Sequence, residues 1–274
     1  TWQPQRVASV PGNQPSDLHS FGRTQNYFIG AEFPLVVNPL ALLLWLKPYI
    51  ENFRWKPGRG ATFIVIDRRD GKVVGRYESE AFFAFHHVNA FEQGDEIILD
   101  INAYEDAEII KAYYLDRLKD PNSKLPFGKL RRYRIPLKGK RAEYETISDT
   151  CIELANFDSA RYSLNPAYRF VYASSLNPEH PQGFYNQIVK IDIATRAEQT
   201  WYQPGCYPGE PIFVGRPDRI AEDDGLILSV VLDSLKGNSF LLVLDAHAFE
   251  EIARAEIPHP VLFGYHGAFF HPGS

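Results

Sequence analysis

Methionine is absent from the 274 residues, and the chain begins with Thr1. We therefore expect this sequence to be a piece of a longer or processed protein. Only two cysteines occur, Cys151 and Cys206, which are too few for a disulfide framework and fit a reducing compartment. Basic residues are not in excess, since 29 Lys and Arg face 34 Asp and Glu to give a net charge of −5. This balance argues against a nucleic-acid partner.

Long apolar runs are missing as well. The most apolar segment, 35–46 (LVVNPLALLLWL), is well short of the roughly 20 residues that a membrane-spanning helix needs. The chain is nevertheless 45% hydrophobic and 23% charged, which excludes a disordered protein and allows a large core.

Apolar segments that run into a turn and return as more polar segments recur along the chain, which indicates β-hairpins. The segments are 61–66 with 72–76, 186–193 with 197–201, 239–244 with the residues after Asp245, and more weakly 130–135. The strand ends recur at intervals of about 50 to 70 residues, within the range of propeller blades. We expect an all-β repeat protein with short helical insertions, and we favour a propeller over a sandwich.

Two segments are helix candidates. Residues 105–119 place Ile110, Tyr114 and Leu118 at four-residue spacing. Residues 38–50 begin with Asn38 as a candidate cap and are broken by Pro48.

Three of the eight histidines stand in contexts that differ from ordinary turns. His86 lies in an apolar segment, His266 is flanked by glycines, and His19 precedes a predicted strand. A buried imidazole needs partners for both nitrogens, and a metal with a second acceptor supplies them. The alternative is that they are hydrogen-bonded core or turn histidines, because their spacing matches no local metal motif.

The segments around these histidines resemble motifs of the carotenoid cleavage oxygenase family, especially the branch with β-carotene oxygenases and the retinal pigment epithelium isomerohydrolase. Residues 18–27 (LHSFGRTQNY) resemble its HSFG-x-T-x-NY motif, and residues 85–92 (FHHVNAFE) its FHHxNxxE motif. Further matches follow in the family's order over nearly the whole chain: CIEL (151–154, with Ala155 in place of a proline), YRFVY (168–172), GEPIFV (209–214), EDDG (222–225), FLLVLDA (240–246) and YHGAF (265–269).

The resemblance implies a seven-bladed β-propeller that holds one Fe(2+) ion on its axis with four histidines. By motif, His19, His86 and His266 are three of these ligands. Glu153 would orient His86, and Glu210 would orient His266; the alternative for both glutamates is a surface salt bridge. Strand alternation would direct His87 to the opposite face from His86.

The family's first histidine ligand and a third orienting glutamate lie upstream of the HSFG segment, where this chain has no histidine. We therefore expect residues 1–274 to be one domain, the C-terminal part of an incomplete propeller, with helical insertions at its active-site face. The site would then be incomplete, and this chain alone would be inactive.

The resemblance implies an iron-dependent dioxygenase that uses O2 to cleave a conjugated C=C bond of a carotenoid or apocarotenoid into two carbonyl products. Phe82, Phe83, Phe85 and Tyr114 are candidates for a substrate tunnel, although aromatic core packing explains each equally well. The alternatives are a stilbene-cleaving oxygenase, a retinyl ester isomerohydrolase on the same site, or an inert propeller fragment.

The apolar segment also gains a role from the resemblance, because family members extract lipophilic substrates from membranes. We expect a cytoplasmic, peripheral membrane protein whose leucines and tryptophan insert into the lipid surface. The alternative is a buried core helix. The candidate contact residues are Leu40, Leu42, Leu43, Leu44, Trp45 and Leu46.

Overall fold

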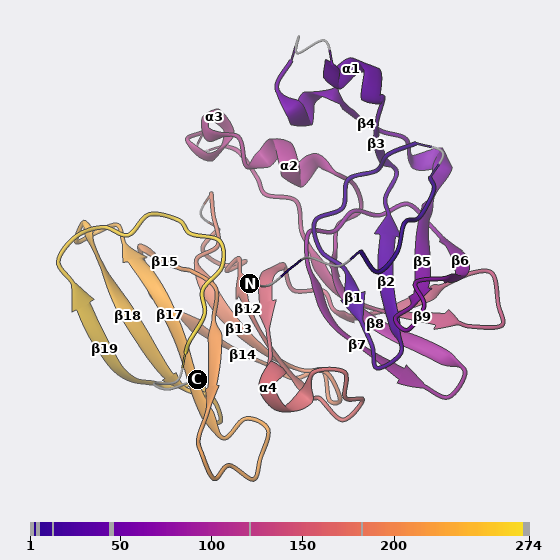
Figure 1. Ribbon diagram of the computed structural model, residues 1–274. Coiled ribbons are helices and arrows are strands. Elements are labelled where there is room, and N and C mark those ends of the chain that lie inside the picture. The colour runs from indigo at the N-terminus through magenta and orange to yellow at the C-terminus, as the bar shows by residue number, and fades with distance from the viewer. Residues whose placement is uncertain are drawn as a thin grey trace. The chain divides into compact units, whose positions relative to one another are not determined.

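The computed structural model describes residues 3, 6–12, 14–43, 47–120, 122–181 and 183–270, and it is built mainly of antiparallel β-sheets (Figure 1). The chain divides into two compact units. The first unit comprises residues 1–111 and 131–146, and the second comprises residues 112–130 and 147–274.

The first unit holds a four-stranded sheet in the order β1-β2-β5-β6. Its predicted hairpin, β5 to β6, turns where Asp67 accepts backbone hydrogen bonds from Arg69 and Gly71. Gly71 has a φ of 71°, a conformation that favours glycine. The strands are β1 (Gly22–Arg23), β2 (Tyr27–Glu32), β5 (Ala61–Asp67) and β6 (Val73–Ser79).

A second sheet follows in the order β10-β9-β8-β7. The strand β8 is buried along nearly its whole length, so it forms the centre of the core here. The strands are β7 (His87–Gln93), β8 (Glu96–Ala103), β9 (Lys129–Pro136) and β10 (Glu143–Ser148).

The apolar segment forms an insertion whose helix is much shorter than residues 38–50. Asn38 accepts a hydrogen bond from the Leu40 amide at 3.1 Å, as expected of a cap. None of the residues of α1 is buried, so the alternative of a core helix is wrong for its described part. Leu44, Trp45 and Leu46 lie outside the described residues. The insertion comprises β3 (Leu35–Val37), α1 (Pro39–Leu43), η1 (Tyr49–Asn52), β4 (Phe53–Trp55) and η2 (Pro57–Arg59).

The second unit contains two further sheets, β11-β12-β13-β14 and β15-β17-β18-β19, with β16 paired to β17. Alternate residues of β17 pack inward with Ile188, Phe240 and Leu242 to form its core. The strands are β11 (Ile152–Asn156), β12 (Phe170–Ser175), β13 (Gln187–Asp192), β14 (Glu198–Tyr202), β15 (Cys206–Pro208), β16 (Ile212–Gly215), β17 (Gly225–Asp233), β18 (Asn238–Asp245) and β19 (Glu251–Ile257).

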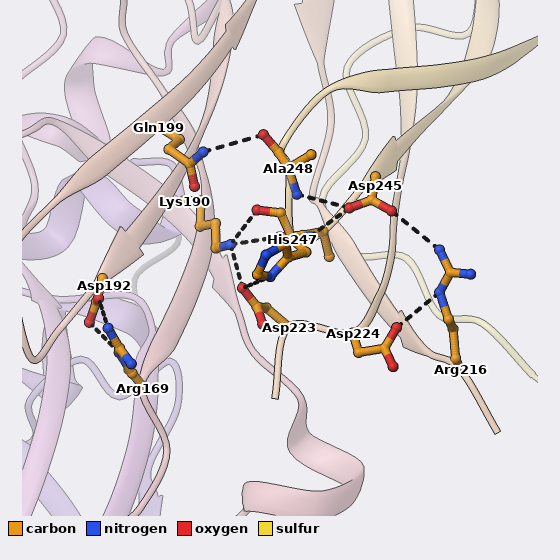
Figure 2. Close-up of polar contacts among 11 residues, drawn as sticks. Arg169, Lys190, Asp192, Gln199, Arg216, Asp223, Asp224, Asp245, His247 and Ala248 are labelled. Carbon is orange, nitrogen blue, oxygen red and sulfur yellow. Dashed lines mark hydrogen bonds and ion pairs between the residues drawn. The ribbon is translucent and has the colours of Figure 1, made fainter. Parts of the chain in front are cut away.

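The EDDG motif ties these two sheets together through buried polar contacts (Figure 2). Lys190 donates to the Asp223 carboxylate at 2.8 Å and to the Ala246 carbonyl at 2.7 Å, and His247 lies 3.1 Å from the same carboxylate. Burial alone would raise the pKa of Asp223, but Lys190 and His247 together outweigh burial and hold that pKa below its usual value. The motif therefore has a structural role in this chain, because its Asp223 joins the two sheets.

The predicted helix over residues 105–119 is wrong as a single element. Two short helices replace it, because Tyr114 has an extended ψ of 140° between them. These two helices are α2 (Glu108–Ala112) and α3 (Leu115–Leu118), and a further short helix, α4 (Ser159–Tyr162), lies in the second unit. Within the described ranges, no helix has both the length and the apolar character that a membrane span requires.

The expectation of an all-β chain built of hairpins with short helical insertions is confirmed. All four predicted hairpins are present, as β5-β6, β9-β10, β13-β14 and β18-β19. The expectation of a single domain stays a prediction.

Candidate metal centre

Two of the predicted ligands, His19 and His86, meet in the first unit. His19 precedes β1, and His86 directly precedes β7. Their ring centroids lie 5.1 Å apart at an interplanar angle of 82°, and nitrogen atoms of the two rings lie within 4.8 Å of each other. This separation allows both imidazoles to bind one ion, since each metal–nitrogen bond is about 2 Å long.

Close packing of β1 against the second sheet brings the two histidines together. A Cβ atom on Gly22 would lie only 2.6 Å from a methyl group of Leu99, so the glycine of the HSFG segment permits this approach. The pairing of β7 with β8 shifts register between His87 and Asn89, and such an irregularity can redirect a side chain.

His87 bonds to Ser20 instead of joining the pair. Its Nδ1 lies 2.7 Å from the Ser20 hydroxyl, and its backbone N–H donates to the same oxygen at 3.0 Å. Burial, together with the neighbouring His86, lowers the pKa of His87 to about 3. The ring is therefore neutral at physiological pH.

Glu92 joins the same two motifs at their other end. Its Oε1 accepts from the Thr24 hydroxyl at 2.7 Å and from the Asn26 amide at 2.8 Å, and its Oε2 accepts from the Asn26 side chain at 2.9 Å. The sequence motifs contain Ser20, Thr24, Asn26 and Glu92, but pattern reasoning assigned them no role. Segment 18–27 is mainly polar, so the pattern offered no signal that singled out Ser20, Thr24 or Asn26.

In the second unit, Glu210 contacts His266. Its Oε1 lies 3.3 Å from Nδ1 of His266, and its Oε2 accepts from the Gly267 amide at 2.8 Å. A carboxylate at Nδ1 favours the tautomer that leaves the Nε2 lone pair for a metal. Both residues line a groove of about 430 Å³ whose apolar wall includes Ile212, Leu228 and Val230.

Glu153 lies in β11 of the second unit and is buried. Its Oε2 accepts a hydrogen bond from the Leu154 amide at 2.7 Å. Leu154 has a φ of 52°, and the pairing of β11 with β12 shifts register just after Glu153. The pairing of Glu153 with His86 and the convergence of His266 with His19 and His86 both join the two units, so they stay predictions.

The aromatic candidates occupy different environments. Phe82 and Phe83 are fully buried, and Phe82 stacks on Tyr133 at 4.9 Å, so both pack in the core of the first unit. Phe85 is half-buried and contacts the His19 ring edge-on at 5.3 Å. Tyr114 precedes α3 in the second unit. A tunnel role for these residues stays a prediction.

The donor set fits a divalent transition metal. Imidazole is a ligand suited to iron, and a carboxylate on the distal nitrogen is the usual support for a metal-binding histidine. The His19–His86 pair and the Glu210–His266 contact supply these two features separately in the two units.

Comparison with known proteins gives consistent results. The family model described as retinal pigment epithelial membrane protein matches residues 2–271. Carotenoid cleavage dioxygenase 8 homolog A of Oryza sativa is 36% identical and covers 94% of this chain and 48% of its own length. A carotenoid isomerooxygenase of Galleria mellonella is 34% identical, and the match covers 93% of this chain and 52% of that relative. The chain thus spans about half the length of the curated relatives it matches.

A solved structure is also similar, namely the cobalt-substituted apocarotenoid oxygenase of Synechocystis. It superimposes with a TM-score of 0.85 at 28% identity, over 94% of this chain and 53% of that one. The similarity confirms the expected fold, an all-β propeller of which this chain forms part. Fold, motifs and relatives agree that the chain belongs to the retinal pigment epithelial membrane protein family, the family of the carotenoid cleavage oxygenases.

Proposed function

We propose that this chain is part of a non-haem Fe(2+) dioxygenase that cleaves a conjugated C=C bond of a carotenoid or apocarotenoid into two carbonyl products. The observation that carries the proposal is the His19–His86 pair, which joins the two motif segments. The named activities of the relatives support the reaction class, and the cobalt in the similar Synechocystis oxygenase supports a metal in this fold.

In this proposal His19, His86 and His266 hold the ion, and Glu153 and Glu210 orient the rings of His86 and His266. The bound Fe(2+) would supply activation of O2 for addition across the alkene. Neutral imidazoles leave the charge of the ion uncompensated. A carboxylate that accepts a hydrogen bond from an imidazole supplies negative charge near the ion, raises the basicity of that imidazole and fixes the orientation of its ring. The chain spans about half of its relatives, and the proposal therefore assigns it only part of the site.

The lipophilic polyene would be taken from a membrane surface. Leu40 and Leu43 are 67% and 72% exposed on α1, which gives the first unit an apolar group available to lipid. Burial of about two leucines in lipid supports reversible attachment without a spanning helix. Relatives are named as chloroplastic and mitochondrial, so the cytoplasmic location stays a prediction.

Product analysis tests the reaction. A protein that contains this chain at the full length of its relatives, loaded anaerobically with Fe(2+), should convert a carotenoid and O2 into two carbonyl products. Cleavage of a stilbene with no carotenoid turnover, or isomerisation and hydrolysis of a retinyl ester, would replace the proposal with one of the two alternatives. Turnover that survives replacement of His19 and His86 by alanine would contradict the assigned site.

A further inference from the structure

The Ser20 hydroxyl makes contacts on both sides of His86. It donates to the Phe85 carbonyl at 2.6 Å, and it accepts from the His87 backbone N–H at 3.0 Å. Phe85 and His87 are the two chain neighbours of His86, and Ser20 is the chain neighbour of His19. One side chain therefore fixes the backbone that carries one histidine against the backbone that carries the other.

The hydrogen-bonding capacity of Ser20 also fixes the tautomer of His87. A serine hydroxyl has one proton to donate and two lone pairs to accept with. The proton goes to the Phe85 carbonyl, which can only accept, and one lone pair receives the His87 backbone N–H. The 2.7 Å contact with Nδ1 of His87 must then be an Nδ1–H donated into the second lone pair.

Two further observations indicate that the Ser20 contact acts only on the geometry near the histidines. Nε2 of His87 is buried and has no hydrogen-bond partner among the described residues, so Ser20 supplies the polar contact of this ring. The bonds of Glu92 to Thr24 and Asn26 hold the same two segments at their other end. Loss of Ser20 should therefore change the geometry near the histidines while the sheets stay paired.

We propose that Ser20 is the positioning residue of the His19–His86 pair, and that it acts by bonding to both neighbours of His86 and by holding His87 as its Nδ1–H tautomer. The metal-related part of this proposal rests on the proposed function. The part about the His87 tautomer does not rest on the proposed function, because the tautomer is a property of the metal-free chain.

The metal-free test is the ¹⁵N spectrum of the histidine side chains. His87, assigned by comparison with His87→Asn, should show a protonated Nδ1 and an unprotonated Nε2, and Ser20→Ala should change this pattern. An Nε2-protonated His87 in the unsubstituted chain would overturn the proposal, whether or not the chain binds a metal.

The metal test uses Co²⁺, whose visible spectrum reports its ligands. Ser20→Ala should weaken Co²⁺ binding about 10- to 100-fold, the range for loss of a residue that positions a ligand, and Ser20→Thr should restore most of it. The control is Ser234→Ala, which removes a comparable serine bond, Ser234 to the Gly205 carbonyl at 2.8 Å, in the second unit. Its Co²⁺ affinity should not change.

Equal Co²⁺ affinity of Ser20→Ala and the unsubstituted chain would overturn the positioning role. If Ser20→Ala does not fold, His87→Asn and His87→Leu replace it, because asparagine keeps an N–H donor near the position of Nδ1 and leucine does not. Binding should be retained in the first and weakened in the second, and equal binding by both would overturn the proposal. If the unsubstituted protein at the full length of its relatives binds no Co²⁺, the proposed function fails, and the ¹⁵N result alone decides the role of Ser20.

Discussion

The two units hold their candidate ligands in different ways. In the first unit, His19 and His86 adjoin paired strands, and Ser20 and Glu92 bond the two motif segments to each other. In the second unit, His266 lies in the segment 258–270, which is exposed throughout and contains no strand. Glu210 holds this segment at His266 and Gly267, and Ser239 holds it at Val261.

The difference shows two ways to position a metal ligand. Paired strands next to both residues and the bonds of Ser20 position the first two histidines, so their geometry is tied to the stability of the unit. Glu210 contacts the third in an exposed segment, and exposed segments with few buried contacts open at little cost in free energy. Substitutions in the first unit should therefore affect stability and metal binding together, whereas Glu210 should affect metal binding alone.

The largest effect should come from removing the pair in the first unit. We expect His19→Ala with His86→Ala to weaken Co²⁺ binding by more than the 10- to 100-fold that loss of a supporting residue causes, because two direct ligands are lost. Titration followed by visible absorption measures this. His180→Ala, in an exposed loop of the second unit, is the control and should bind normally. Unchanged affinity of the double variant would exclude the pair as ligands.

Glu210→Gln should weaken Co²⁺ binding about 10- to 100-fold with little change in the free energy of unfolding. Hydrogen exchange at Gly267 should also become faster, because its amide loses a charged acceptor. Glu256→Gln, an exposed glutamate of the second unit that accepts a hydrogen bond from Asn238, is the control. A large loss of stability in Glu210→Gln would show that the carboxylate is needed for folding and would remove the contrast between the units.

Both units expose apolar side chains, but we expect only those of α1 to contact lipid. Leu40→Ser with Leu43→Ser should lower liposome binding about 100-fold or more, since each leucine contributes about 1.5 kcal/mol or more when buried in lipid. Leu262, which is 76% exposed in the second unit, is the matched control, and Leu262→Ser should bind normally. Co-sedimentation measures both. Equal loss in the control would show that the second unit also contacts lipid.

The smallest effect should come from Glu92. Burial alone would raise its pKa, but hydrogen bonds from Thr24 and Asn26 outweigh burial and hold the pKa below its usual value. A lowered folded-state pKa stabilises the protein above the usual carboxyl range, and this contribution is lost as the pH falls through the lowered value. Glu92→Gln should cost about 1 kcal/mol at neutral pH and less at acidic pH.

Urea unfolding across the acidic range measures this difference, with Glu96→Gln as an exposed-pair control in the same sheet. A cost that did not shrink on acidification would contradict the assigned role of the Glu92 carboxylate.

Much of the fold was predictable because hairpin turns are local. Asp67 and Gly71 specify the turn of β5 and β6 through contacts within a few residues. The helix over residues 105–119 was mispredicted because four-residue spacing does not reveal the extended backbone at Tyr114. Residues 38–50 resembled a core helix in hydrophobicity, but burial depends on tertiary packing, and α1 has no buried residue.

The sequence predicted the residue types of the candidate site but not the hydrogen bonds that position them. The motifs identified His19 and His86, but their contact depends on the packing of β1 against the second sheet, which the pattern did not predict. The bonds of Ser20 and Glu92 join residues 65 to 68 positions apart, so no local pattern contains them. Convergence of His266 with the pair depends on the placement of two units, which sequence spacing does not specify.

X-ray absorption of the chain loaded with one Co²⁺ equivalent tests the central claim, that His19, His86 and His266 bind the same ion. The account predicts a nitrogen shell at about 2.1 Å with imidazole scattering from three histidines, falling to two in His266→Ala. An oxygen shell without imidazole scattering, or a spectrum unchanged in His266→Ala, would contradict it.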